Sequence, residues 1–440
     1  MAATPSLRLP AACVLCLLTC CERLSTAEAE ALAQEEVVAG VAACLTPDAA
    51  ASAPEDAAPA ASRYGAALRR ARVALSPPEM ASTAGMALLV CDTGCCLMAQ
   101  GAASGGAGAL PPRAQFKALL LSTGALGAIC ARAHAAAHAL CVDTPAGDTS
   151  RDEAAAALAR CTRVLEHVCF EAEACAQHVL TWMPPDGATC AHGQLLPALC
   201  SCLAPLTLRA GDAGAPPCVG AALRSALAVV TNVTNERPQA GAALLACGGV
   251  ASLAQLLRPL SQSVLQSHGA PSGAHADALN AALCALANAA EVCPGVAGAL
   301  SGDHLQFVAQ LFAQAHALTT GDGGPQAPEA GDGDVTLEAL DAAERSAAAV
   351  ILAAYCALLL ACLLHAGGEG GGGHGAVAAC QPGGSLEAVL ATVERFLLFH
   401  TRINTLSPTA EATLREAARS MRAWHQAQAQ QQAAPAEGGG

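Results

Sequence analysis

The chain has 440 residues and a formal net charge of −14, and 53% of its residues are hydrophobic although only 2% are aromatic. Alanine alone supplies 111 residues; because alanine is the best helix former and strand formers are scarce, the composition predicts an all-α protein. The negative charge, without any concentrated basic cluster, argues against a nucleic-acid-binding domain, and a charged fraction of 13% is too low for a disordered chain.

The 23 cysteines are odd in number, and many lie inside apolar stretches such as residues 12–18 (ACVLCLL). Buried free cysteine behaves as a small hydrophobic residue. The cysteines therefore favour a reduced, intracellular setting over a disulfide framework.

Residues 11–21 (AACVLCLLTCC) follow Arg8 and resemble the core of a signal peptide. However, Pro10 can open a helix at its first turn, and the apolar residues at 11, 14, 15 and 18 have helical spacing. We favour the helix and keep the signal peptide as the alternative.

Stretches rich in Pro, Gly, Ala and Asp divide the chain into segments of mostly about 35–50 residues, each long enough for two or three helices, as in stacked helical repeats. We predict one helical-repeat domain over residues 1–425 and a disordered Gln/Ala/Gly tail over 426–440. The breaks lie near residues 46–62, 100–113, 143–152, 209–217, 262–275, 319–335 and 367–384.

Residues 222–246 align with residues 278–302. Without the break at 262–275 their period would be about 40 residues, in the range of HEAT and armadillo repeats. Each unit is predicted to form a helix, a turn set by proline and a second helix, which must stack on a neighbour to bury its apolar face. The matched pairs are Leu223 and Leu279, Leu227 and Leu283, Asn232 and Asn288, Pro238 and Pro294, and Leu244 and Leu300.

Asparagine is rare, yet Asn232, Asn235, Asn280 and Asn288 all lie in these two units. A buried asparagine can bridge neighbouring backbones through its donor and acceptor groups. Alternatively, Asn232 and Asn288 end helices, where asparagine tolerates the left-handed conformation. We predict a structural role of either kind.

Residues 347–364 form an uninterrupted apolar run at the lower length limit of a transmembrane helix. A helix buried in the middle of a solenoid is also apolar all round, and we favour that explanation. Further along, Ser407 and Pro408 are expected to cap a helix with Leu414, Ala418, Met421 and Trp424 on one face.

Three patterns could carry chemistry, and each has a simpler explanation. Cys13 and Cys16 have CxxC spacing but apolar surroundings, and residues 367–375 are glycine-rich but lack the Lys-Ser/Thr pair of a phosphate loop. A zinc site would require Cys190, His192, Cys200 and Cys202 to converge. We therefore predict no catalytic, cofactor-binding or metal-binding residue.

The final hundred residues carry the most specific pattern. The segment 352–361 (LAAYCALLLA) is followed by 393–400 (VERFLLFH) and 403–408 (INTLSP). A second block is VTNVTNE at 230–236 with ACGGV at 246–250, and weaker matches surround Lys117 and Cys161. In collinear order, these blocks resemble the C-terminal domain of the wings apart-like (WAPL) cohesin-release proteins, particularly those of plants.

This resemblance implies a right-handed α-α superhelix of HEAT/armadillo-like repeats. It also implies a non-enzymatic, chromatin-associated nuclear protein that binds cohesin subunits and the cohesin-associated HEAT-repeat regulator and promotes cohesin release. No direct binding of nucleic acid, membrane or small-molecule substrate is expected, and no cofactor. Candidate protein-contact residues are Asn235, Glu236, Glu394 and Arg402.

Two departures and three rival interpretations accompany the resemblance. The Phe-Gly-Phe motifs of animal family members do not occur here, so the chain is either a fragment or recruits cohesin through its helical domain alone. Many polar surface residues of the family are replaced by alanine. The rivals are a generic armadillo scaffold of another complex, a metal protein or enzyme hidden in the Cys-rich segments, and a membrane protein.

Overall fold

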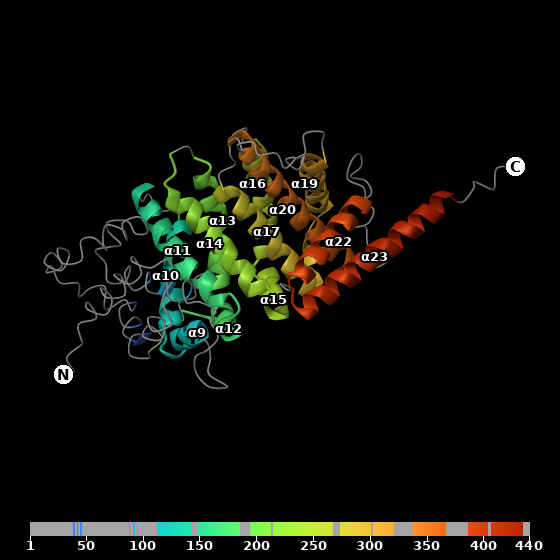
Figure 1. Ribbon diagram of the computed structural model, residues 1–440. Coiled ribbons are helices and arrows are strands. Elements are labelled where there is room, and N and C mark those ends of the chain that lie inside the picture. The colour runs from blue at the N-terminus through green and yellow to red at the C-terminus, as the bar shows by residue number, and fades with distance from the viewer. Residues whose placement is uncertain are drawn as a thin grey trace, which may run out of the picture. The chain divides into compact units, whose positions relative to one another are not determined.

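The computed structural model describes eight separate residues near the N-terminus and nine longer ranges. The separate residues are Val38, Ala39, Ala42, Leu45, Leu88, Cys91, Asp92 and Cys95. The ranges are 112–142, 148–184, 194–212, 214–266, 273–300, 302–320, 337–366, 386–403 and 406–433. Within these ranges every regular element is a helix, which confirms the predicted all-α fold of HEAT/armadillo-like helices (Figure 1).

The chain divides into two compact units, residues 1–233 and 234–440. The single repeat domain over residues 1–425 stays a prediction. In the first unit, α10 packs against α11 and α13, and the short helices α9 and α12 contact each other. The bounds are α9 Pro112–Ser122, α10 Ala125–Cys141, α11 Asp148–Cys169, α12 Glu173–Thr181, α13 Leu195–Ala210 and α14 Pro217–Thr234, the last residue of which opens the second unit.

In the second unit, α20 is the central helix, because it packs against α17, α19, α22 and α23. The bounds are α15 Pro238–Ala246, α16 Gly249–Gln266, α17 Gly273–Val292, α18 Gly295–Ala299, α19 Gly302–Thr320, α20 Leu337–Ala366, α22 Leu386–Arg402 and α23 Pro408–Ala433. Burial against four neighbours accounts for most of the apolar run at 347–364, in which Val350 and Ile351 remain 45% and 46% exposed.

Two of the described helices are long and apolar enough to cross a membrane by length and composition, Pro217–Thr234 and Ser346–Ala366, or up to four if each bent pair of helices forms one span. Of their residues, 56% and 67% are buried inside the protein. Residues 11–21, the possible signal peptide, lie outside the described residues.

From α11 to α19, the helices follow each other in triplets of one long, one short and one long helix. The triplets are α11–α12–α13 with 22, 9 and 16 residues, α14–α15–α16 with 18, 9 and 18, and α17–α18–α19 with 20, 5 and 19. The sequence predicts two helices in each of the aligned units, and the structure adds a third, α16 or α19. The prediction stopped short because the aligned segments end at residues 246 and 302, where these third helices begin.

Left-handed residues recur at equivalent corners of the triplets. Glu171, between α11 and α12, and Glu236, between α14 and α15, both have φ of 54°. Gly124 precedes α10 with φ of 78°, and Gly248 precedes α16 with φ of 74°. A Cβ at either glycine would meet nothing within 4 Å, so glycine is favoured there by its backbone conformation and not by lack of space.

The predicted start of the last helix is confirmed. The Ser407 hydroxyl accepts a hydrogen bond from the Ala410 amide at 3.1 Å, and Pro408 is the first helical residue. Leu414, Ala418 and Met421 are buried along one face. The helix runs to Ala433, beyond residue 426, where the sequence places the start of the tail.

Helix α15 approaches α17 very closely at Gly241. A Cβ at this position would lie 2.9 Å from Cβ of Cys293 and 3.2 Å from Cγ2 of Val292. The Cβ of Cys293 is fixed to the backbone and cannot move aside. The helix packing therefore requires glycine at residue 241.

We expect Gly241→Ala to lower the free energy of unfolding by about 1–2 kcal/mol, because overpacking outweighs the gain in helix propensity. Gly298→Ala is the matched control, since a Cβ at Gly298 in α18 would meet nothing within 4 Å. Chemical denaturation measures both. A Gly241→Ala protein as stable as the Gly298→Ala protein would contradict the close approach.

Candidate functional site

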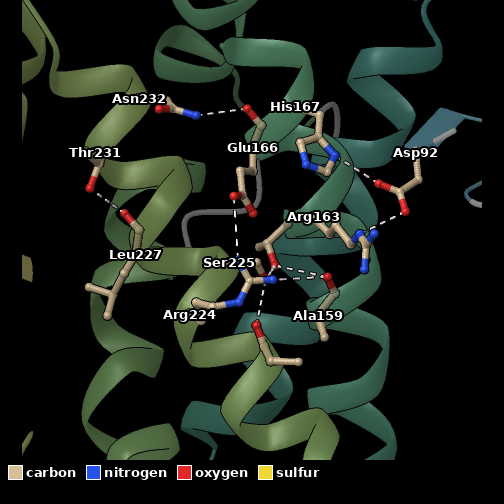
Figure 2. A network of polar contacts seen from close by, with 12 residues as sticks. Asp92, Ala159, Arg163, Glu166, His167, Arg224, Ser225, Leu227, Thr231 and Asn232 are labelled. Carbon is tan, nitrogen blue, oxygen red and sulfur yellow. Dashed lines mark hydrogen bonds and ion pairs between the residues drawn. The ribbon is translucent and has the colours of Figure 1, made fainter. Parts of the chain in front are cut away.

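A polar network joins α11 to α14 (Figure 2). The hydroxyls of Thr162 and Ser225 lie 2.6 Å apart and both residues are fully buried. Ser225 Oγ also lies 3.5 Å from the carbonyl oxygen of Ala159. A serine side chain reaches only a short distance, so the backbones of the two helices must approach closely here.

About two turns further along α14, another side chain holds the backbone of α11. Asn232 Nδ2 donates a hydrogen bond of 2.9 Å to the carbonyl oxygen of Glu166 (Figure 2). This confirms the predicted structural role of Asn232 as a bridge to a neighbouring backbone. Arg224 Nη1 lies 3.6 Å from Oε1 of Glu166, whereas the buried Oε2 of Glu166 has no hydrogen-bond partner. Burial raises the pKa of the Glu166 carboxyl, and the nearby Arg224, His167 and Arg163 reduce that rise.

A neighbouring face of α11 is held by Asp92, which is only 5% exposed. Its carboxylate lies 2.9 Å from Nε of Arg163 and 3.0 Å from Nδ1 of His167 (Figure 2). Asp92 therefore ties a distant part of the chain to two successive turns of α11. Sequence reasoning missed this contact because a single aspartate among apolar residues carries no spacing signal.

The only lysine, Lys117 on α9, is also a structural residue. It is buried, and Nζ donates a hydrogen bond to the carbonyl oxygen of Phe170, just after the end of α11. Arg113 lies over the Phe170 ring, 5.9 Å from its centroid. Burial lowers the pKa of Lys117, as does the nearby Arg113. The sequence predicts no structural role for this lysine, which contributes there only to the resemblance.

Most of the described cysteines are buried. Burial raises the pKa of Cys284 and Cys362 to about 12 and also raises the pKa of Cys91, Cys202 and Cys356. A thiol with a raised pKa is a poor nucleophile at neutral pH.

The alternative chemical sites are only partly within the described residues. No group of three or more His, Cys, Asp or Glu in the described part of the chain is placed to hold a metal ion. Cys200 and Cys202 are buried in α13, and Cys202 donates to the carbonyl oxygen of Leu199. The other members of the considered sites, Cys13, Cys16, Cys190, His192 and residues 367–375, lie outside the described residues.

The four predicted contact residues lie in two separate parts of the structure. Asn235 is exposed and Glu236 is left-handed, both in the turn between α14 and α15. On α22, Glu394 pairs with Arg422 of α23, with Nε of Arg422 at 2.9 Å, whereas Arg402 is exposed in the last turn. Among the described residues, no hydrogen bond or ion pair connects Asn235 or Glu236 to Glu394 or Arg402.

Comparison with known proteins places the chain in no family. No protein-family model and no curated protein matches its sequence. Two similar solved structures are engineered proteins from the Northeast Structural Genomics Consortium. One has a TM-score of 0.40 at 12% identity, covering 80% of this chain and 94% of the engineered one. The other has a TM-score of 0.26 at 14% identity, covering 96% of each chain. Such low scores support no inference about function.

We expect Asn232→Ala to lower the free energy of unfolding by about 0.5–1.5 kcal/mol, because the Glu166 carbonyl loses its side-chain donor and keeps only the Phe170 amide. Asn235→Ala is the matched control and should change stability by less than about 0.5 kcal/mol, since its side chain is exposed. Urea unfolding measures both. Equal effects would mean that the bridge to Glu166 contributes nothing.

The pKa of Glu166 predicts a pH-dependent effect of Glu166→Gln. Because burial raises the folded-state pKa of Glu166 above its ordinary value, the folded state binds this proton more tightly than the unfolded state. The free energy of unfolding of the wild-type protein therefore falls as pH rises from the unfolded-state pKa to the folded-state pKa of Glu166. At lower pH this loss of stability is absent.

The stability of Glu166→Gln relative to wild type should accordingly rise between about pH 4 and pH 7. Glu153→Gln, at an exposed position of the same helix, is the control and should show no such trend. Unfolding by denaturant across this pH range measures the difference. A flat difference for Glu166→Gln would contradict the assignment.

Proposed function

We propose that this chain is a non-enzymatic protein-binding scaffold that binds cohesin and promotes its release from chromatin. The coarser part of this proposal, a scaffold, is supported by the succession of helical triplets, because helical-repeat proteins in general use extended surfaces for binding. The finer part is supported by the sequence resemblance to the wings apart-like proteins. The proposed location is the nucleus, on chromatin, and the proposed partners are cohesin subunits and the cohesin-associated HEAT-repeat regulator.

The single observation that carries the proposal is the placement of the family-like blocks. In VTNVTNE, Asn232 bridges α14 to α11 and Glu236 forms the left-handed corner. In ACGGV, Gly248 forms the next corner, and in INTLSP, Ser407 caps α23. Residues of the family-like blocks thus form a bridge between two helices, two left-handed corners and a helix cap.

A scaffold of this kind can act without chemistry. If it binds one conformation of the cohesin ring more tightly than another, it shifts the population towards the favoured conformation by the difference in binding free energy. Release then requires only that the favoured conformation is the open one. No catalytic residue, cofactor or metal is part of this proposal.

The proposal predicts that the tagged full chain recovers cohesin subunits from nuclear extract, quantified by mass spectrometry against a tagged unrelated helical-repeat protein. It also predicts that removing the protein from cells slows the exchange of fluorescent cohesin on chromatin. Failure to enrich cohesin, with other proteins enriched instead, would favour the alternative of a scaffold for another complex.

The two other rivals have direct tests. Stoichiometric zinc in the purified, reduced protein would favour a metal protein. Recovery from cells only in detergent would favour a membrane protein. The proposed function predicts neither result.

A further inference from the structure

Helix α22 has two apolar faces, and its own unit covers only one of them. The covered face packs where α22 meets α20 and α23. Near the C-terminal end, however, Leu398, Phe399 and Ile403 are 55%, 56% and 50% exposed. The residues of the covered face are Leu386, Val389, Val393 and Leu397.

Two arginines lie on the open face. Positions 395, 398, 399 and 402 recur at intervals of three and four residues, so Arg395 and Arg402 flank Leu398 and Phe399 along one side of the helix. Both arginines are exposed. At about 1.5 Å per residue, their Cα atoms are separated by about 10 Å along the helix axis. We call Arg395, Leu398, Phe399, Arg402 and Ile403 the α22 surface.

The described residues of its unit do not neutralise the charges of the α22 surface. On α23, Arg415, Arg419 and Arg422 pair with Glu411, Glu416 and Glu394 respectively. In the described part of the chain, Arg395 and Arg402 make no ion pair or hydrogen bond. The chain as a whole carries a net charge of −14, so two unpaired cations beside an apolar stripe are a local exception that calls for a complementary anion.

These features select one kind of partner. Clustered exposed apolar side chains mark interaction surfaces, and an apolar stripe about one and a half helical turns long can pack on the apolar face of another helix. Carboxylates one heptad apart on that helix would meet both arginines, as charges flanking a coiled-coil seam do. Two arginines are too few to hold a strongly negative chain on nucleic acid or an anionic membrane.

We infer that the α22 surface binds an acidic amphipathic helix of a partner protein, with its apolar face on Leu398, Phe399 and Ile403 and its carboxylates on Arg395 and Arg402. The inference rests on the proposed function as a protein-binding scaffold and specifies the chemistry of one partner. Glu394, a predicted contact residue, acts instead within the chain by fixing α23 beside α22. Arg402, another predicted contact residue, contacts the partner.

The test uses the full chain and two synthetic helical peptides of three heptads each. Both carry leucine on one face; one has glutamates flanking the leucines and the other has lysines. Fluorescence anisotropy measures binding. The wild-type protein should bind the glutamate peptide in preference to the lysine peptide. The double variant Arg395→Glu/Arg402→Glu should bind the glutamate peptide at least tenfold more weakly and should now prefer the lysine peptide.

The apolar stripe has its own variant and control. Phe399→Ser should weaken the binding of both peptides. Leu318→Ser on α19 is the matched control, because Leu318 is 61% exposed, and it should bind as wild type does. All the altered side chains are exposed, so circular dichroism should show unchanged helicity.

Four results would overturn the inference: no saturable binding of the glutamate peptide, no change of preference on charge reversal, an equal loss in Leu318→Ser, or self-association of the wild type that Phe399→Ser abolishes. Arginine-dependent binding to phosphatidylcholine vesicles containing phosphatidylserine, without peptide binding, would also overturn it.

The same variants separate this inference from the proposed function. Peptide binding through the α22 surface without recovery of cohesin from nuclear extract would contradict the proposed function and support the inference. Recovery of cohesin without any peptide binding would contradict the inference alone.

Discussion

The constraint on which this structure depends is the small size of its core side chains. A quarter of the chain is alanine, and burial stabilises by only about 25 cal/mol per Å² of apolar surface. Helices with such short side chains gain packing energy only when their backbones come close. The contact of Thr162 with Ser225 between α11 and α14, and the contact of Gly241 with Cys293 between α15 and α17, are two consequences.

Close approach alone would leave the helices free to slide, because one alanine resembles the next. The few polar residues remove that freedom. Asn232 donates a hydrogen bond to one particular carbonyl of α11, and Asp92 contacts two successive turns of the same helix. Lys117 donates a hydrogen bond to the carbonyl of Phe170, just after α11 ends. Each bond is satisfied in only one register, so these residues specify the packing that the apolar residues stabilise. The left-handed corners at Glu171 and Glu236 then direct the chain into the short helices.

Much of this could be predicted from the sequence, for identifiable reasons. Proline, glycine and serine act locally, so the cap at Ser407 and the approximate helix limits followed from residue type. Asn232 stood out because asparagine is rare here. The third helix of each triplet was missed because the aligned segments end before it, and Glu171 because glutamate has no preference for the left-handed conformation. A sequence also cannot show which of two apolar faces its neighbours cover, so the open face of α22 and the pairing of Glu394 with Arg422 needed coordinates.

We infer that buried polar contacts set the register of these closely packed, alanine-rich helices. A double-mutant cycle on Thr162→Val and Ser225→Ala, measured by urea unfolding, tests it most directly. The two hydroxyls contact each other across α11 and α14, so the two substitutions should be coupled by about 1 kcal/mol. Additive effects, within about 0.3–0.5 kcal/mol, would contradict the claim.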